Sequence, residues 1–183
     1  MKIAARDVIL KDGRKIVLRS ASVADAENIL KHLKISHSES YRNLNQSATY
    51  WDNVSVSDEE KILGSFESSP AQFMLVALDN ERIVGGLGFW GYGAEFVKHT
   101  AGVGMSIQKE FNGQGLGTAM MNVMLEEAKR AKFHRVELTV RTYNEAGIKL
   151  YEKVGFERIG LLKDAAFIDG EYVSEYSYQK ILK

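Results

Sequence analysis

The stretch Asn112-Gly113-Gln114-Gly115-Leu116-Gly117-Thr118 decides the interpretation of the fold. Its three alternating glycines permit positive φ angles and let a ligand approach the main chain closely. An alternating apolar run at residues 103–107 precedes it, and an amphipathic run at residues 116–131 follows it. This pattern predicts a strand, a glycine-rich turn and a helix. Because the first N–H groups of a helix attract anions, we expect a phosphate or pyrophosphate site here.

Two common phosphate-binding motifs do not fit this turn. A Walker-type loop ends in Gly-Lys-Ser/Thr, whereas Gly117-Thr118-Ala119 contains no lysine. A Rossmann turn needs G-x-G-x-x-G/A, and counting from either of the first two glycines leaves neither Gly nor Ala at the sixth position. Residues 86–91 do read G-x-G-x-x-G, but a loop follows them, so they predict only a bend. We therefore interpret residues 112–118 as a pyrophosphate cradle made of main-chain N–H groups.

The composition is that of a soluble globular protein. A length of 183 residues is enough for one domain with a real core. The formal net charge of zero argues against general binding to nucleic acid or membranes. The absence of cysteine excludes disulfides, thiolate nucleophiles and cysteine-based zinc sites. We expect no metal, and because no signal peptide or membrane-length apolar run is recognisable, we expect a cytoplasmic protein.

The remaining patterns predict about seven strands and about four helices. The expected strands are 15–19, 72–78, 82–89, 100–107, 135–140, 156–162 and 172–182. The expected helices are 20–34, 57–67, 116–131 and 145–154. Residues 1–13 are polar with a turn at 11–13, and residues 35–56 are expected to form a long polar loop. The order is β-α-α-β-β-β-α-β-α-β-β.

Two motifs make the chain resemble the GNAT superfamily of acyl-CoA N-acyltransferases. The pyrophosphate loop of that family, Gln/Arg-x-x-Gly-x-Gly/Ala, falls on residues 112–117. Its second signature falls on residues 144–156, Asn-Glu-Ala-Gly-Ile-Lys-Leu-Tyr-Glu-Lys-Val-Gly-Phe. The resemblance implies an α/β fold of the α+β type, with a mixed, mostly antiparallel sheet in a single domain over residues 1–183. It also implies acetyl-CoA as co-substrate. Asn112 departs from the expected Gln or Arg. This departure bears on the affinity for the cofactor more than on the identity of the loop.

The resemblance also implies roles for the matching residues. The main chain of Met105, Ser106 and Ile107 would pair with the pantetheine arm as an extra strand does. The pyrophosphate would be held by the N–H groups around Asn112, Gly113, Gln114, Gly115, Leu116, Gly117 and Thr118. Asn144 and Ala146 would contact the arm of the cofactor. Tyr151 would be the general acid that protonates the departing thiolate, because a phenol with a pKa near ~10 can donate to it.

The base that deprotonates the attacking amine is harder to identify. The strand at 100–107 contains no acidic residue, and Gly102 stands where some relatives carry glutamate. Glu95 and His99 lie just before this strand, and histidine titrates in the required range. We hypothesise a water chain that ends at His99 or Glu95.

The acceptor must be recognised by residues outside these motifs. Glu39 and Glu95 could hold a cationic amine. Its pocket could be walled by Tyr41, Trp51, Trp90 and Tyr92, although such residues are also typical of ordinary surface and core. The segments 38–41 and 163–178 look similar to a bacterial branch of the family that acetylates amino acids, polyamines or related small amines. We therefore expect direct acetyl transfer to the primary amine of a small molecule, through a tetrahedral intermediate.

Two other functions stay open at this point. The fold also serves enzymes that acetylate a protein N-terminus or lysine. An acyl-CoA-binding sensor without catalysis is the third reading, because the strand at 100–107 lacks an acid. The aromatic-rich closing strand at 172–182 could pair with a second copy, which allows a homodimer.

Overall fold

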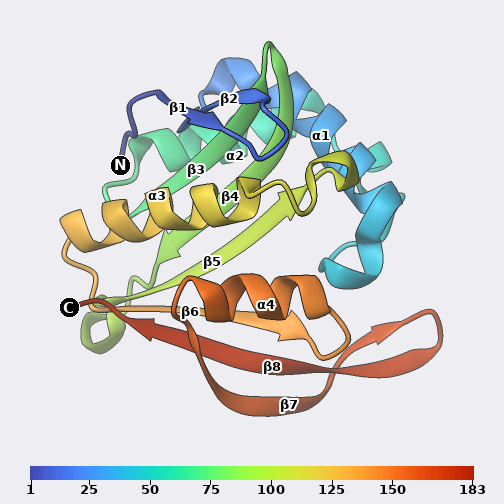
Figure 1. Cartoon of the computed structure of the whole chain (residues 1–183), viewed down its shortest axis with the longest axis vertical. Coiled ribbons are helices and arrows are strands. Elements are labelled where there is room, and N and C mark those ends of the chain that lie inside the picture. Colours follow the sequence, from blue (N-terminus) through green and yellow to red (C-terminus); the bar gives the residue numbers. More distant parts are fainter.

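The centre of the fold is one eight-stranded sheet, seen in a computed structural model that describes all residues 1–183 (Figure 1). The strand order is β1-β2-β3-β4-β5-β6-β8-β7, and only β5 and β6 pair in parallel. The strands are β1 (Arg6–Ile9), β2 (Lys15–Ser20), β3 (Gln72–Asp79), β4 (Arg82–Gly91), β5 (Thr100–Ile107), β6 (Arg135–Arg141), β7 (Glu157–Ile168) and β8 (Glu171–Ile181). The helices are α1 (Ala26–Ser40), α2 (Val56–Ser68), α3 (Leu116–Arg130) and α4 (Glu145–Lys153).

The helices cover both faces of the sheet. Adjacent glycines of β4 show the two faces, because side chains alternate along a strand. Gly85 approaches Met120 of α3, whereas Gly86 approaches His32 of α1. A core cluster of 26 buried residues includes α3 and the strands beneath it. A smaller cluster of 6 buried residues joins α1 and α2 to β3 and β4. The molecule therefore has three layers around its first five strands.

The sheet opens between β5 and β6. These strands share only three paired positions, Thr100↔Arg135, Ala101↔Val136 and Gly102↔Glu137. Beyond Gly102, β5 stays paired with β4 as far as Ile107, and β6 stays paired with β8 as far as Arg141. The two strands therefore diverge beyond Gly102. Helix α3 makes the crossover that a parallel pair requires.

Most of the predicted elements are present, but three expectations were wrong in extent. Residues 6–9 form β1 and pair with β2, so the sheet has eight strands instead of about seven. Helix α1 begins at Ala26, after a 3-10 turn at Val23–Asp25, instead of at residue 20. It continues to Ser40 instead of ending near 34, because Ser36 and His37 extend its buried stripe with polar side chains. Strand β7 extends to Ile168, past an irregularity between Leu162 and Ala166. None of the helices has the length and apolar character needed to cross a membrane.

Candidate active site

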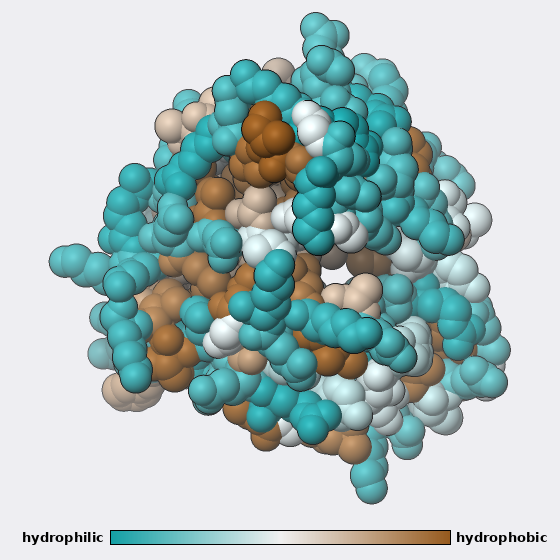
Figure 2. Space-filling view, viewed as in Figure 1, coloured by the Kyte–Doolittle hydropathy of each residue, from teal (hydrophilic) through white to brown (hydrophobic).

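A cleft of about 1030 Å³ occupies the opening between β5 and β6. Besides these strands, its lining comes from the start of α3, from α4, from β7 and β8, and from the loop that follows α1. Figure 2 shows the molecule hollowed at this place, with hydrophilic and apolar residues around the opening. The cleft is therefore built at the one point where the sheet is interrupted.

One wall of the cleft is the free edge of β5. Met105 and Ile107 face α3, where both approach Gly117. Ser106 points to the opposite face, toward α1. The main-chain edge that faces β6 has no strand partner beyond Gly102. Since main-chain N–H and C=O groups need partners, this edge can pair with an extended amide-bearing ligand.

The glycine-rich turn leads from this edge into α3. Gly113 and Gly115 have φ angles of +75° and +94°, and a Cβ at either position would meet nothing within 4 Å. Gly115 is the N-cap of α3 and offers no side chain to cap the helix. A Cβ on Gly117 would lie 2.9 Å from Leu150 Cδ2, so a larger residue here would force the Leu150 side chain to move. The first N–H groups of α3 thus border the cleft uncovered, as an anion site requires.

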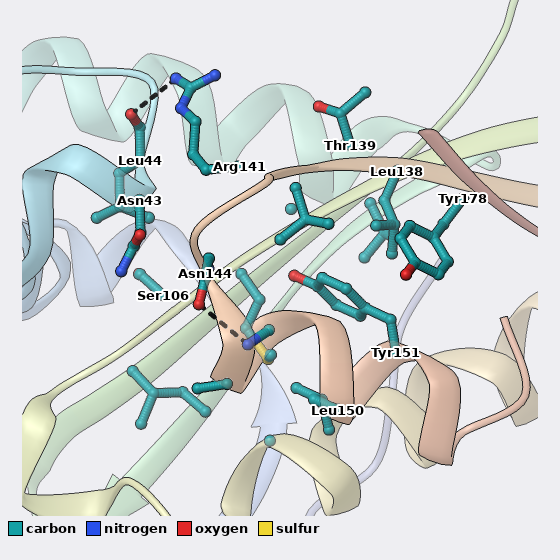
Figure 3. A pocket seen from close by; sticks show the side chains of 18 of the residues that line it. Asn43, Leu44, Ser106, Leu138, Thr139, Arg141, Asn144, Leu150, Tyr151 and Tyr178 are labelled. Carbon is teal, nitrogen blue, oxygen red and sulfur yellow. Dashed lines mark hydrogen bonds between the residues drawn. The ribbon is translucent and has the colours of Figure 1, made fainter. Parts of the chain in front are cut away.

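The cleft contains most of the residues expected at a cofactor site. It is lined by Met105, Ser106, Ile107, Asn112, Gly113, Gly115, Leu116, Gly117, Thr118, Asn144 and Ala146. Gln114 lies outside the lining, and its main-chain oxygen accepts a hydrogen bond from the Lys11 N–H at 3.1 Å. Asn144 caps α4, because its Oδ1 accepts the Gly147 N–H at 3.0 Å. The amide group of Asn144 is therefore held at the edge of the cleft (Figure 3).

Tyr151 extends from α4 into the cleft (Figure 3). Its ring packs near Phe156 and Tyr178, with centroids 6.2 and 6.4 Å away. Its hydroxyl makes no hydrogen bond within the protein, whereas the hydroxyl of Tyr178 donates to Glu152 at 2.9 Å. Burial raises the pKa of Tyr151 to about 12, because it disfavours the phenolate. Tyr151 therefore presents a neutral O–H donor to whatever occupies the cleft.

The inner end of the cleft is formed by Trp90, Tyr92, Arg135 and Glu137. The Tyr92 hydroxyl donates to Glu137 Oε1 at 2.7 Å, and Arg135 lies 2.7 Å from Glu137 Oε2. Burial, together with this bond, raises the pKa of Tyr92 to about 12. A Cβ on Gly102 would lie 2.5 Å from the Trp90 ring, so no side chain fits there. This packing gives a physical reason for the missing acid on β5.

An ion pair that the sequence did not reveal lies at the opposite end of the cleft. Arg141 of β6 pairs with Glu175 of β8, and both side chains are almost fully buried. Arg141 Nη2 also donates to the main-chain oxygen of Leu44 at 3.3 Å (Figure 3). It donates to Asn45 Oδ1 at 3.1 Å as well. The only sequence signal is the polar alternation of β6, in which Arg135, Glu137, Thr139 and Arg141 share one face.

The residues expected to bind the acceptor divide into two groups. Trp90 and Tyr92 line the cleft, whereas Glu39, Tyr41 and Trp51 do not. The Glu39 carboxylate accepts the Lys109 N–H at 2.7 Å. The Tyr41 hydroxyl donates to Asp169 at 2.9 Å, and Trp51 packs edge-on against His37 at 5.3 Å. These three side chains therefore make their contacts elsewhere in the protein and do not form the cleft surface.

The expected bases also lie away from the cleft. His99 sits at the start of β5, where its main-chain oxygen accepts the N–H groups of His134 and Arg135. Glu95 is exposed in a short 3-10 turn. Neither residue lines the cleft, whose only carboxylates belong to Glu137 and Glu175. No group of three or more His, Asp or Glu side chains gathers as a metal ion would require.

Residues 32–156 match the Acetyltransferase (GNAT) family. An L-amino acid N-acetyltransferase of Escherichia coli is 34% identical over 84 residues, 45% of this chain and 52% of that protein. An N-alpha-acetyltransferase of Sulfurisphaera tokodaii is 25% identical over 173 residues, 88% of this chain and 91% of that protein. The chain thus covers about half of the Escherichia coli relative and most of the archaeal one.

Solved structures give the same result for the fold. The crystal structure of a GNAT family acetyltransferase from Streptococcus pneumoniae superposes with a TM-score of 0.85 at 25% identity, covering 92% of this chain and 99% of that one. The structure of Salmonella typhimurium yncA with acetyl-CoA has a TM-score of 0.77 at 19% identity, covering 92% and 94%. Because the family match spans more than half of the sequence and includes both the glycine-rich turn and α4, the chain belongs to the acetyltransferase (GNAT) family.

Proposed function

We propose that the protein transfers an acetyl group from acetyl-CoA to the primary amine of a small molecule, such as an amino acid or a polyamine. One observation carries this proposal: the free edge of β5, the uncovered start of α3 and the free hydroxyl of Tyr151 all border one cleft. An acyl-CoA has a matching order of groups, with a pyrophosphate, an amide-bearing arm and a thioester. The family membership supports the same chemistry.

In this proposal the pantetheine arm pairs with β5 and the pyrophosphate lies at the start of α3. A neutral amine attacks the thioester carbonyl carbon, forming the C–N bond and a tetrahedral oxyanion. Collapse of this intermediate restores the C=O bond and breaks the C–S bond. Tyr151 gives its proton to the sulfur, while the proton of the acetylated nitrogen passes to a base. The products are the N-acetyl compound and CoA.

Glu137 replaces Glu95 and His99 as our candidate for that base. It is a carboxylate inside the cleft, and its side chain is 29% exposed, so water can reach it. Glu175 is the other carboxylate, but its side chain is only 12% exposed and its partner Arg141 only 5%, whereas Glu137 and its partner Arg135 are both about one third exposed. The hypothesised water chain therefore ends at Glu137, beside the inner end of β5.

A small acceptor is favoured by the loop that crosses the mouth of the cleft. Asn43, Leu44 and Asn45 belong to its lining. Arg42 and Tyr41 both bond Asp169 in the turn between β7 and β8, so the loop is tied to the far side. A cleft crossed by a loop in this way admits a slender molecule more readily than it admits the surface of a folded protein. The Escherichia coli relative is named for L-amino acid acceptors.

Acetylation of a protein N-terminus is the second candidate. The observation in its favour is the Sulfurisphaera tokodaii N-alpha-acetyltransferase, which aligns with 88% of this chain. A flexible N-terminus is also slender, so the bridged cleft alone does not separate the two acceptors. An acyl-CoA-binding sensor is the third candidate, and it differs from both in having no turnover.

Thiol release from acetyl-CoA separates these functions. The assay offers the purified protein free amino acids, polyamines and short peptides with free N-termini, and calorimetry measures CoA binding in parallel. Turnover with free amines supports our proposal, and turnover with peptides alone supports the second candidate. CoA binding without turnover on any acceptor supports the sensor. Absence of CoA binding would overturn all three.

We also propose a homodimer in the cytoplasm. The closing strand expected to pair with a second copy, β8, lies between β6 and β7 and has no free edge, so that expectation was wrong. Strand β7 is instead at the edge of the sheet, and its Ile159, Leu161 and Leu162 are about half exposed. Exposed apolar residues on an edge strand favour pairing with another strand. Light scattering coupled to gel filtration measures the mass directly, and a single 20.5 kDa species would contradict the dimer.

A further inference from the structure

A buried hydrogen-bond chain connects β4 to the cleft through α1. It runs from Gln108 through His32 to Ser106, and none of the proposed chemical steps uses it. Ser106 lines the cleft, while His32 and Gln108 are only 1% and 2% exposed. A Cβ on Gly86 would lie 3.7 Å from the His32 ring, so the imidazole packs directly against β4.

Gln108 fixes the direction of the first hydrogen bond. Its Nε2 lies 3.1 Å from the main-chain oxygen of Ile83. A carbonyl oxygen can only accept, so the amide nitrogen must be at this end of the side chain. The same Nε2 lies 3.3 Å from His32 Nδ1. His32 Nδ1 is therefore the acceptor and carries no hydrogen.

His32 transmits this direction to Ser106. Burial lowers the pKa of His32 to about 4, and nearby His37 adds to the effect, so the ring is neutral at pH 7. A neutral imidazole with a bare Nδ1 carries its hydrogen on Nε2. His32 Nε2 lies 2.9 Å from Ser106 Oγ. The imidazole therefore donates, and the serine oxygen accepts.

Ser106 is left with a hydrogen to donate, and no protein group accepts it. Because Ser106 lines the cleft and is only partly buried, this O–H is available to a ligand there. An acceptor amine in its ammonium form offers only donors and cannot pair with it. The pantetheine arm of an acyl-CoA offers amide carbonyl oxygens along its length.

We propose that His32 and Gln108 are positioning residues that hold Ser106 Oγ–H as a donor to an amide carbonyl oxygen of the pantetheine arm. This inference rests on the proposed binding of acyl-CoA and adds a side-chain contact to the main-chain pairing. The direction of all three hydrogen bonds follows from the single contact between Gln108 and Ile83.

The inference is tested by measuring the CoA Kd of four proteins by calorimetry. These are wild type, Ser106→Ala, His32→Leu and the double variant. Each single substitution should weaken binding about three- to tenfold, which corresponds to one neutral hydrogen bond. The double variant should be no weaker than the weaker single variant, because His32 acts through Ser106. Multiplying effects, or unchanged binding in Ser106→Ala, would overturn the inference.

Two further measurements keep the test decisive if His32→Leu does not fold. His32→Gln retains an N–H group and should bind CoA more tightly than Ser106→Ala. The ¹⁵N spectrum of wild-type protein should show His32 as the neutral tautomer with hydrogen on Nε2, and a hydrogen on Nδ1 would contradict the hydrogen-bond chain.

Ser36→Ala is the matched control. It removes a buried hydroxyl of α1 that bonds Leu33, away from the cleft, and should leave CoA binding unchanged.

The same measurements separate this inference from the proposed function. If wild-type protein does not bind CoA, the proposed function fails first. If wild-type protein binds CoA and turns over, but Ser106→Ala binds equally well, only the role of Ser106 fails.

Discussion

Arg141 and Glu175 stand directly opposite each other on β6 and β8 and form an ion pair with side chains only 5% and 12% exposed. The same guanidinium reaches Leu44 and Asn45, in the loop that crosses the cleft. This buried ion pair thus links strands β6 and β8, which line the cleft, to the loop that crosses its mouth. The four residues that take part, Arg141, Glu175, Leu44 and Asn45, come from three segments far apart in the sequence.

Glu175→Gln should therefore destabilise the protein strongly. Removing one member of a buried ion pair leaves the other charge uncompensated, which costs about 3–5 kcal/mol. Urea unfolding measures this loss. Arg141→Met combined with Glu175→Leu removes both charges and should recover most of the stability, yet lower turnover because Leu44 and Asn45 lose their anchor. Full activity in the double variant would contradict a role for this anchor.

Tyr151→Phe should lower kcat by roughly 100-fold or more, the usual contribution of a general acid. CoA affinity should stay nearly unchanged, because the hydroxyl has no partner within the protein to lose. Since the pKa of Tyr151 is about 12, its deprotonation should cause no fall in kcat below pH 10. The kcat–pH profile and the CoA Kd of the variant check both points. Tyr176→Phe, at a tyrosine of β8 outside the cleft lining, is the matched control.

Gly115→Ala should weaken CoA binding more than it lowers kcat. Its φ of +94° is strained for any L side chain, although space for a Cβ exists. Relieving that strain shifts the first N–H groups of α3. Gly170→Ala has a similar φ of +84° and equally open space, but lies in the turn between β7 and β8. Gly170→Ala should lower the thermal unfolding temperature about as much as Gly115→Ala does. It should leave the CoA Kd unchanged.

Asp169→Asn should relax acceptor selection without unfolding the protein. Its partner Arg42 is partly exposed, and exposed pairs contribute no more than about 1 kcal/mol. Asparagine tolerates the φ of +53° at this position, so the turn should persist. The ratio of kcat/KM for a peptide to that for a small amine should rise. Asp7→Asn breaks the exposed pair with Lys15 on β1 and should leave the ratio unchanged.

The buried His32 should make stability fall as the pH falls from about 6.5 to 4. In this window the unfolded chain binds a proton at His32, but the folded protein does not, because its pKa is about 4. The largest loss is about 3 kcal/mol. His37 has a lowered pKa and acts in the same direction, so wild type is compared with His32→Leu. Parallel pH curves of the unfolding free energy would refute this assignment.

The parts of the site that the sequence predicted are those coded locally. The strand, turn and helix around Gly115 follow from adjacent residues, and Asn144 caps α4 three residues from its partner Gly147. Local periodicity carries such information because the hydrogen bonds join near neighbours. Tyr151 was reached through the family motif, since a single tyrosine on a helix has no distinguishing pattern.

The parts that sequence reasoning missed depend on contacts between distant segments. Arg141 meets Glu175 and Leu44 only after three strands and a loop have assembled. Glu39 looked free to bind an amine, but it accepts the main-chain N–H of Lys109, seventy residues away. The buried face of α1 continues through Ser36 and His37, whose polarity conceals it from an apolar pattern.

Most proteins protect the outer edges of their sheets, because an unpaired strand invites aggregation. The free edge of β5 is not one of these outer edges, because it lines the cleft beside α3 and α4. A short extended compound with alternating amide groups can enter this cleft. Joined to an anionic group that reaches the start of α3, such a compound is an inhibitor design that needs no nucleotide.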